Sequence, residues 1–254
     1  MSKSSAMAVS EARRRGAVVY GEPIAAGLGT DGTHYFNKCW IHSAGHVMSP
    51  PLRDDPSTPG HLMELLANGD LELTGTDHCV FNTNQKALGK DDFSKIPNGV
   101  NGIEERMSLV WDRGVHTGKM DACRFVAVTS TNAARLFNMY PRKGVVARGS
   151  DADLVVWDPQ AVKQVSTKTH HSGCDFNIFD GMSFHGAPSV VIANGKVVYE
   201  NGTLNVQAGS GRLIERRPFS DYVYSRIKVR DTLRASPVER EPYPGPVVDV
   251  SKGV

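Results

Sequence analysis

An acidic residue follows one apolar run at a position where enzymes often carry out chemistry. The stretch LELTGTDHC, residues 71–79, rises through Leu71 and Leu73, passes Gly75 and ends with Asp77 beside a histidine and a cysteine. A carboxylate at the carboxyl end of a barrel strand can bind a metal or transfer a proton. If it is buried, it needs a charged partner or several hydrogen bonds. A turn or helix-capping aspartate has the same local pattern, so spacing alone leaves both readings of Asp77 open.

Two histidines form a second candidate. His42 and His46 are four residues apart, so on a helix they share one face, and two imidazoles so placed can hold zinc. No acidic residue or third ligand lies nearby in the sequence, which favours a surface pair without a metal. The sequence has no phosphate-binding loop or nucleophile elbow, and its spacing gives no support to Ser–His–Asp catalysis.

Two short loops are stiff enough to present backbone groups to a ligand. Ser49 precedes two prolines in MSPPLR, and Asn98 lies between a proline and a glycine in IPNGVNG. Prolines and glycines restrict such segments to defined turns, and an ordinary turn is the simpler reading of each.

The elements expected before residue 140 alternate between strand and helix. Apolar runs at 17–23 and 71–77 predict buried strands, and each is followed by a long polar loop. Helices are expected at 2–16, 61–69, 103–115, 121–128 and 131–139. This rhythm is typical of a parallel α/β sheet. A complete eight-stranded barrel needs about 250 residues, so residues 1–140 are expected to form the C-terminal half of a (β/α)₈ barrel.

The pattern changes after residue 140. Residues 141–208 contain short β-branched runs, with Asn194-Gly195 as a type I′ hairpin signal, and we expect a small β-sandwich module there. Residues 209–254 are polar, with one amphipathic helix expected at 216–231. An extended, proline-rich tail follows it and is expected to be mobile or to lie on a partner.

Composition excludes several classes of protein. The 29 basic and 27 acidic residues nearly balance, which argues against binding to nucleic acid or to an anionic membrane. No apolar stretch approaches a membrane span, and the N-terminus has no secretory signal. The four cysteines are far apart, as in reduced cytosolic proteins. We therefore expect a cytoplasmic protein.

Several long motifs carry a resemblance to a known family. They are GEPIAAGLGTDGTHY, SPPLR, TGTDHCVFNTNQKALGKDDFSKIPNGVNGIEERMSLVWDRGV, FVAVTSTNAARLFNMYPRKG and GSDADLVVWDP. Together they resemble the dihydropyrimidinase and hydantoinase family of the amidohydrolase superfamily. The non-enzymatic collapsin response mediator proteins share this scaffold.

The resemblance implies a barrel with two zinc ions that hydrolyses a cyclic amide, such as that of dihydrouracil, in a homotetramer to which the C-terminal tail contributes. Asp77 matches the family's last metal ligand, which also handles the proton of the attacking water. Ser49 and Asn98 match positions whose backbone groups contact the substrate ring. The mediator proteins typically lack the aspartate, so its presence favours an enzyme over a scaffold.

The family's other metal ligands have no counterpart in this sequence. We therefore expect a fragment, a truncated gene product or a short isoform that starts at an internal methionine. Catalytic zinc usually takes three protein ligands, and half a barrel exposes two sheet edges, so we expect this chain alone to be inactive and poorly folded.

Overall fold

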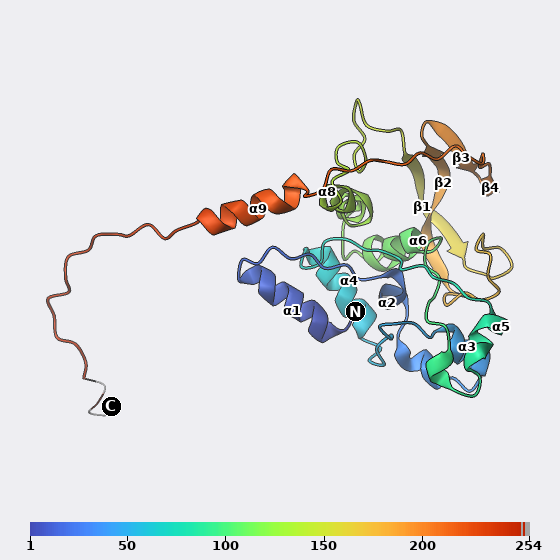
Figure 1. Cartoon of the computed structure of the whole chain (residues 1–254), viewed down its shortest axis with the longest axis horizontal. Helices are drawn as coiled ribbons and strands as arrows, with labels where there is room; N and C mark the ends of the chain where they lie inside the picture. Colours follow the sequence, from blue (N-terminus) through green and yellow to red (C-terminus); the bar gives the residue numbers. More distant parts are fainter. Residues whose placement is uncertain (250, 252–254) are drawn as a thin grey trace.

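The structure is a computed structural model that describes residues 1–249 and residue 251. Figure 1 shows a helical body with an antiparallel sheet along one side and a C-terminal segment that extends away from both. The chain is α/β, and its helices come mainly before its strands. Among the described residues, no helix has the length and apolar character needed to cross a bilayer.

Two helices near the N-terminus begin and end where local chemistry predicts. Helix α1 (Lys3–Arg14) starts after Ser2, whose hydroxyl accepts a hydrogen bond from the Ser5 amide. Helix α4 (Thr58–Asn68) ends at Gly69, which has a φ of 92° in the left-handed region. The predictions for both helices are confirmed.

The two predicted strands lie side by side without forming a regular ladder. The Glu72 amide donates to the Gly21 carbonyl at 3.1 Å, the Ala25 amide donates to Gly75 at 3.0 Å, and the pairing at Gly75 is parallel. This is an isolated bridge, so the prediction of regular strands at 17–23 and 71–77 is wrong. Pro23 has no amide hydrogen to donate, and the Thr74 amide bonds to the Val128 carbonyl of a helical segment instead.

The glycine-rich segment after Pro23 is folded rather than an open loop. Its helical elements are α2 (Ala25–Gly29), the 3₁₀ helix η1 (Gly32–Phe36) and α3 (Trp40–Gly45). Ala25, Ala26 and Leu28 are buried, and the Asp31 side chain caps η1 by accepting from the Thr33 amide at 2.8 Å. The next polar segment contains α5 (Thr83–Lys86), η2 (Ala87–Gly89) and η3 (Phe93–Lys95).

The remaining helices of this half form two runs with π-helical turns. The first run is α6 (Arg106–Val110) and η4 (Trp111–His116); the second is α7 (Ala122–Val126), η5 (Ala127–Thr131) and α8 (Asn132–Leu136). The helix expected at 103–115 begins later than predicted, because Ile103 lies in the turn before α6, where its exposed fraction is 64%. The two helices expected at 121–128 and 131–139 form one continuous helical segment.

A four-stranded antiparallel sheet follows. Its strands, in spatial order, are β1 (Leu154–Gln164), β2 (Ser183–Ala193), β3 (Lys196–Glu200) and β4 (Thr203–Leu204). Asn194 and Gly195 connect β2 to β3 with φ values of 49° and 78°, as a type I′ turn requires. The predicted hairpin is confirmed. One buried cluster contains residues from both sides of position 140, including Leu62, Leu109 and Phe184.

The last described segment is helix α9 (Asp221–Thr232) and an extended tail. The helix starts five residues later than predicted: Pro218 disfavours helical backbone at the residue before it, and Phe219 has a φ of 61° in the left-handed region. No residue of α9 is fully buried, and its contact with the body runs through Tyr222, whose ring lies 6.1 Å from that of Tyr20 and 5.9 Å from the Arg135 guanidinium. Residues 233–249 form no helix or strand and project outward in Figure 1, which agrees with the predicted extended tail.

Candidate functional site

Asp77 is exposed, so it is not a buried carboxylate that would need a charged partner. It comes two residues after the bridge at Gly75, where the parallel pairing has ended, and its φ is 48°. Aspartate is one of the few residues other than glycine that enter this left-handed region readily. Within the described part of the chain, its carboxylate has no hydrogen-bond or ion-pair partner. The side chain is therefore available to a ligand.

Backbone contacts hold the Asp77 segment against residues 100–103. The Cys79 amide donates to the Val100 carbonyl at 3.0 Å, and His78 and Val100 form a parallel bridge. Nδ1 of His78 accepts hydrogen bonds from the amides of Gly102 and Ile103, at 3.2 and 3.4 Å. This ring nitrogen is therefore an acceptor, which places the imidazole hydrogen on Nε2.

The loops that carry Ser49 and Asn98 lie next to each other. The Gly99 amide donates to the Val47 carbonyl at 3.0 Å, and the side chains of Ser49 and Asn98 are both exposed. Gly99 has a φ of 152°, and a Cβ there would lie 2.1 Å from the Cys79 carbonyl oxygen. Only glycine permits this close approach, through which the loop also meets the Asp77 segment.

The side chain of Lys86 connects the two loops that carry Ser49 and Asn98. Its ammonium donates to the carbonyl oxygens of Val47, Pro97 and Gly99, at 2.8, 2.7 and 2.9 Å. Only 3% of the residue is exposed, and burial lowers the pKa of its amine to about 8. The protonated form can donate all three hydrogen bonds, so Lys86 fixes the spacing of the loops that carry Ser49 and Asn98.

A second cation, which is half-buried, bonds to the segment that leads to Asp77. Arg106 donates from Nη1 to the Thr74 carbonyl at 3.1 Å, and burial lowers the pKa of its guanidinium. Arginine still keeps its charge at neutral pH. Gly75 leaves room beside it for Glu22, because a Cβ at position 75 would lie 1.9 Å from Glu22 Oε1.

The structure thus brings the segments of Asp77, Ser49 and Asn98 together, with the three side chains at the surface. A hydrophilic ligand bound there could meet one carboxylate and backbone groups of two stiff loops. Among the described residues, Asp77 belongs to no group of three potential metal ligands, so this chain's carboxylate does not complete a metal site by itself.

Sequence reasoning missed two features. Lys86 has no local signal, because an interior lysine and a surface lysine look alike in a sequence. His34 was not considered with His42 and His46, yet the three imidazoles lie together. The reading of His42 and His46 as a surface pair is wrong, since His46 has an exposed fraction of 1%.

Comparisons with known proteins agree on one family. Residues 60–198 match the model of the amidohydrolase family. The chain is 64% identical over 249 residues to a dihydropyrimidinase of Rattus norvegicus, covering 98% of this chain and 48% of that protein. It is 49% identical to dihydropyrimidinase-related protein 5 of Homo sapiens, over 95% of this chain and 43% of the relative.

Solved structures show the same likeness. A crystal structure of dihydropyrimidinase from Brevibacillus agri aligns with a TM-score of 0.83 and 41% identity, covering 86% of this chain and 47% of that one. The chain spans about half the length of the curated relatives it matches. The family match covers more than half of the sequence, and the chain belongs to the amidohydrolase family.

Proposed function

We propose that the protein carrying this chain hydrolyses the cyclic amide bond of 5,6-dihydropyrimidines, converting dihydrouracil to N-carbamoyl-β-alanine in pyrimidine catabolism. The observation that carries the proposal is the 64% identity to the rat dihydropyrimidinase across nearly the whole chain. Asp77 stands at the position where the family resemblance implies a metal ligand, and its carboxylate is exposed and unpartnered among the described residues.

The proposed architecture follows the same comparison. Residues 1–140 form the C-terminal half of a (β/α)₈ barrel, residues 141–208 part of a β-sandwich, and residues 209–254 a C-terminal helix and tail. The parallel pairings of Ile24 with Gly75 and of His78 with Val100 support the first assignment, because parallel neighbours are what barrel strands require. The antiparallel sheet of β1–β4 supports the second.

Asp77 would transfer the proton during hydrolysis. Its carboxylate accepts the proton of the attacking water and returns it to the ring nitrogen that leaves, first as a general base and then as a general acid. Enzymes of the amidohydrolase family are generally metal-dependent. The proposed cofactor is a pair of zinc ions that makes water nucleophilic near neutral pH and has Asp77 as one ligand. Its other ligands come from outside this chain.

Ser49 and Asn98 would position the substrate ring. Ring amides present one donor and one acceptor side by side, and the backbone groups of two stiff loops can match both. The three hydrogen bonds of Lys86 support this role, because they keep both loops at a fixed separation. The protein is proposed to be a cytoplasmic homotetramer in which the tail contacts a neighbouring subunit.

A scaffolding role like that of the collapsin response mediator proteins is the second candidate. The 49% identity to the human dihydropyrimidinase-related protein 5 motivates it. The higher identity to the rat dihydropyrimidinase and the presence of Asp77 favour hydrolysis.

Dihydrouracil hydrolysis tests the proposal. The protein would be produced from its gene with any coding sequence upstream of Met1, next to the 254-residue chain alone. We expect turnover by the longer product, no turnover by the chain alone, and a loss of about 10²–10⁴-fold in kcat for Asp77→Asn. Asp91→Asn, at an exposed site, is the matched control and should keep the wild-type rate. A longer product that binds zinc but leaves dihydrouracil intact would support the scaffold instead.

A further inference from the structure

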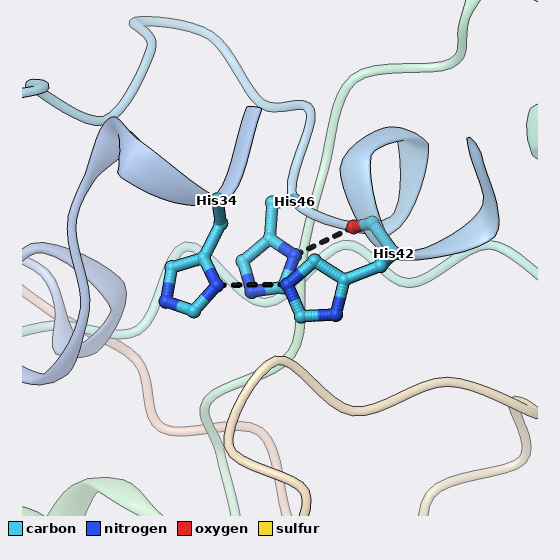
Figure 2. Close-up of side chains that lie close together, drawn as sticks. All are labelled: His34, His42 and His46. Atoms are coloured by element: carbon cyan, nitrogen blue, oxygen red, sulfur yellow. Dashed lines mark hydrogen bonds between the residues drawn. The ribbon is translucent and has the colours of Figure 1, made fainter. Parts of the chain in front are cut away.

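Three imidazoles from two neighbouring elements lie close together (Figure 2). His34 comes from η1, His42 lies on α3, and His46 caps the C-terminal end of α3. One ring nitrogen of each histidine lies within 4.8 Å of the other two. Nδ1 of His34 and Nε2 of His42 are 2.8 Å apart, and the rings of His34 and His46 stack at 4.3 Å between centroids.

His46 is oriented as a metal-binding histidine would be. Its Nδ1 donates to the His42 carbonyl oxygen at 2.7 Å, which leaves the lone pair on Nε2. Backbone carbonyls commonly hold the non-ligating nitrogen of metal-bound histidines in this way. Burial lowers the pKa of the His46 imidazole to about 4, so the ring is neutral at physiological pH.

The Nε2 atom of His46 has no hydrogen-bond partner among the described residues, although the ring is almost completely buried. The backbone of Ile178 approaches the ring, but not with hydrogen-bond geometry. A buried polar atom without a partner is uncommon in native proteins and calls for an explanation. A bound cation would satisfy it.

The surroundings define the kind of cation. In the part of the chain that the structure describes, no carboxylate or thiolate joins the three rings. Phe176 meets the rings of His42 and His46 edge-on, at 6.5 and 5.7 Å between centroids, and forms an apolar wall. Neutral imidazoles bind zinc, copper and nickel well, whereas magnesium and calcium prefer oxygen ligands.

We propose that His34, His42 and His46 form a mononuclear three-histidine site for a divalent transition ion, with zinc as its representative occupant. His34 and His42 are half-buried, which leaves a fourth position for water. A tetrahedral ion with bonds of 2.0–2.1 Å places its nitrogen ligands about 3.3 Å apart. Binding therefore separates the His34–His42 pair slightly and draws His46 inward, and the ring of His34 or His46 must rotate out of their parallel stack, because imidazole lone pairs lie in the ring plane.

The site would also act on the neighbouring loop. Val47 follows His46 directly, and its carbonyl accepts from Lys86 and from the Gly99 amide. Ser49 comes two residues later. An ion at the three histidines would therefore join η1 to α3 and stiffen the loop that carries Ser49. None of the three histidines belongs to the site proposed around Asp77.

Zinc and cobalt titrations test this site. Calorimetric titration of the purified protein with Zn²⁺, and the visible absorption of bound Co²⁺, give its stoichiometry and geometry. We expect His34→Gln and His46→Phe each to bind one ion fewer than the wild type in the accessible concentration range. The affinity of the three-histidine site for Zn²⁺ should fall by about 100-fold or more, because replacing even the outer-shell partners of metal ligands lowers metal affinity 10–100-fold. His116→Asn removes an exposed histidine of η4 and should bind as the wild type does.

Two controls separate this site from the proposed function. Asp77→Asn should keep the ion held by the histidines, because that residue is not among its ligands. His34→Gln alters a half-buried side chain, so it addresses the case in which His46→Phe fails to fold. Equal Zn²⁺ affinity and stoichiometry in the wild type and in His34→Gln would overturn the proposal, whether or not the protein hydrolyses dihydrouracil.

Discussion

The ammonium of Lys86 lies 2.8 Å from the carbonyl oxygen of Val47, two residues before Ser49. The same nitrogen reaches Pro97 and Gly99, on either side of Asn98. One interior lysine therefore bridges the two loops to which the family resemblance assigns substrate contacts. Its role is positional, because it bonds only to backbone carbonyls in the described structure.

Replacing Lys86 with methionine should destabilise the fold. The change keeps an unbranched apolar stem but removes the donor shared by three carbonyls, and buried acceptors without partners cost about 1–3 kcal/mol. We expect the free energy of unfolding, measured by urea denaturation, to fall by that amount. Lys90→Met is the control, since Lys90 is exposed and only faces Asp91 at 3.9 Å. Equal losses in the two variants would contradict the role of Lys86.

Lys86 should also make stability depend on pH in alkaline solution. Burial lowers its pKa to about 8, below the ordinary lysine value of 10.5 that applies to the unfolded chain. Between these values the unfolded chain binds one more proton than the folded protein. Stability therefore rises with pH in this window, by up to about 1.4 kcal/mol per pH unit. Below pH 8 both states are protonated and this contribution is constant.

The measurement is the difference in unfolding free energy between the wild type and Lys86→Met from pH 7 to 10.5. Taking the difference removes the titration of groups that the two proteins share. Above pH 8, we expect the unfolding free energy of the wild type to rise relative to that of Lys86→Met. A difference that stays flat across the range would show that the amine of Lys86 keeps its ordinary pKa.

Local rules in the sequence were sufficient for several elements. Ser2 caps α1, Gly69 ends α4, and Asn194-Gly195 forms the expected hairpin turn. Each of these features depends on residues within a few positions of one another. Local preference is therefore a good guide there.

The candidate sites depended on contacts that no local rule describes. The exposure of Asp77 results from where the parallel pairing with residues 21–25 ends. The burial of Lys86 depends on two loops that close over it. His34 joins His42 and His46 through a chain reversal between η1 and α3, which a search for helical spacing does not detect.

Gly45 should be intolerant of a side chain. A Cβ at this position would lie 2.2 Å from the ring of Phe176, the aromatic wall of the three-histidine site. Gly45→Ala would displace that ring, and overpacking of this kind costs about 1–3 kcal/mol. In Gly60→Ala, within α4, the new methyl group meets only the Lys119 amine at 4.0 Å. That control should gain about 0.5–1 kcal/mol from helix propensity. Thermal unfolding measures both changes: the melting temperature should fall in Gly45→Ala and rise in Gly60→Ala. A Gly45→Ala protein more stable than the wild type would refute the close packing.

A buried polar network joins the helical half to the segment before β2. Nδ2 of Asn177 donates to Glu105 Oε1 at 2.7 Å, and its Oδ1 accepts from Asn101 at 2.8 Å and from the Phe179 amide at 2.9 Å. Asn177 and Glu105 are each 2% exposed. The carboxylate of Glu105 therefore depends on amide donors rather than on water.

Asn177→Ala should be among the more damaging single changes outside the proposed sites. It removes a donor to a buried carboxylate and leaves the Phe179 amide without its acceptor, and hydrogen bonds to charged groups are worth about 1.5–3 kcal/mol. We expect a loss of at least that size in urea unfolding. Asn205→Ala, at an exposed position after β4, should change stability by less than about 0.5 kcal/mol. If Asn177→Ala proved as mild as this control, the network would not join the two halves of the chain energetically.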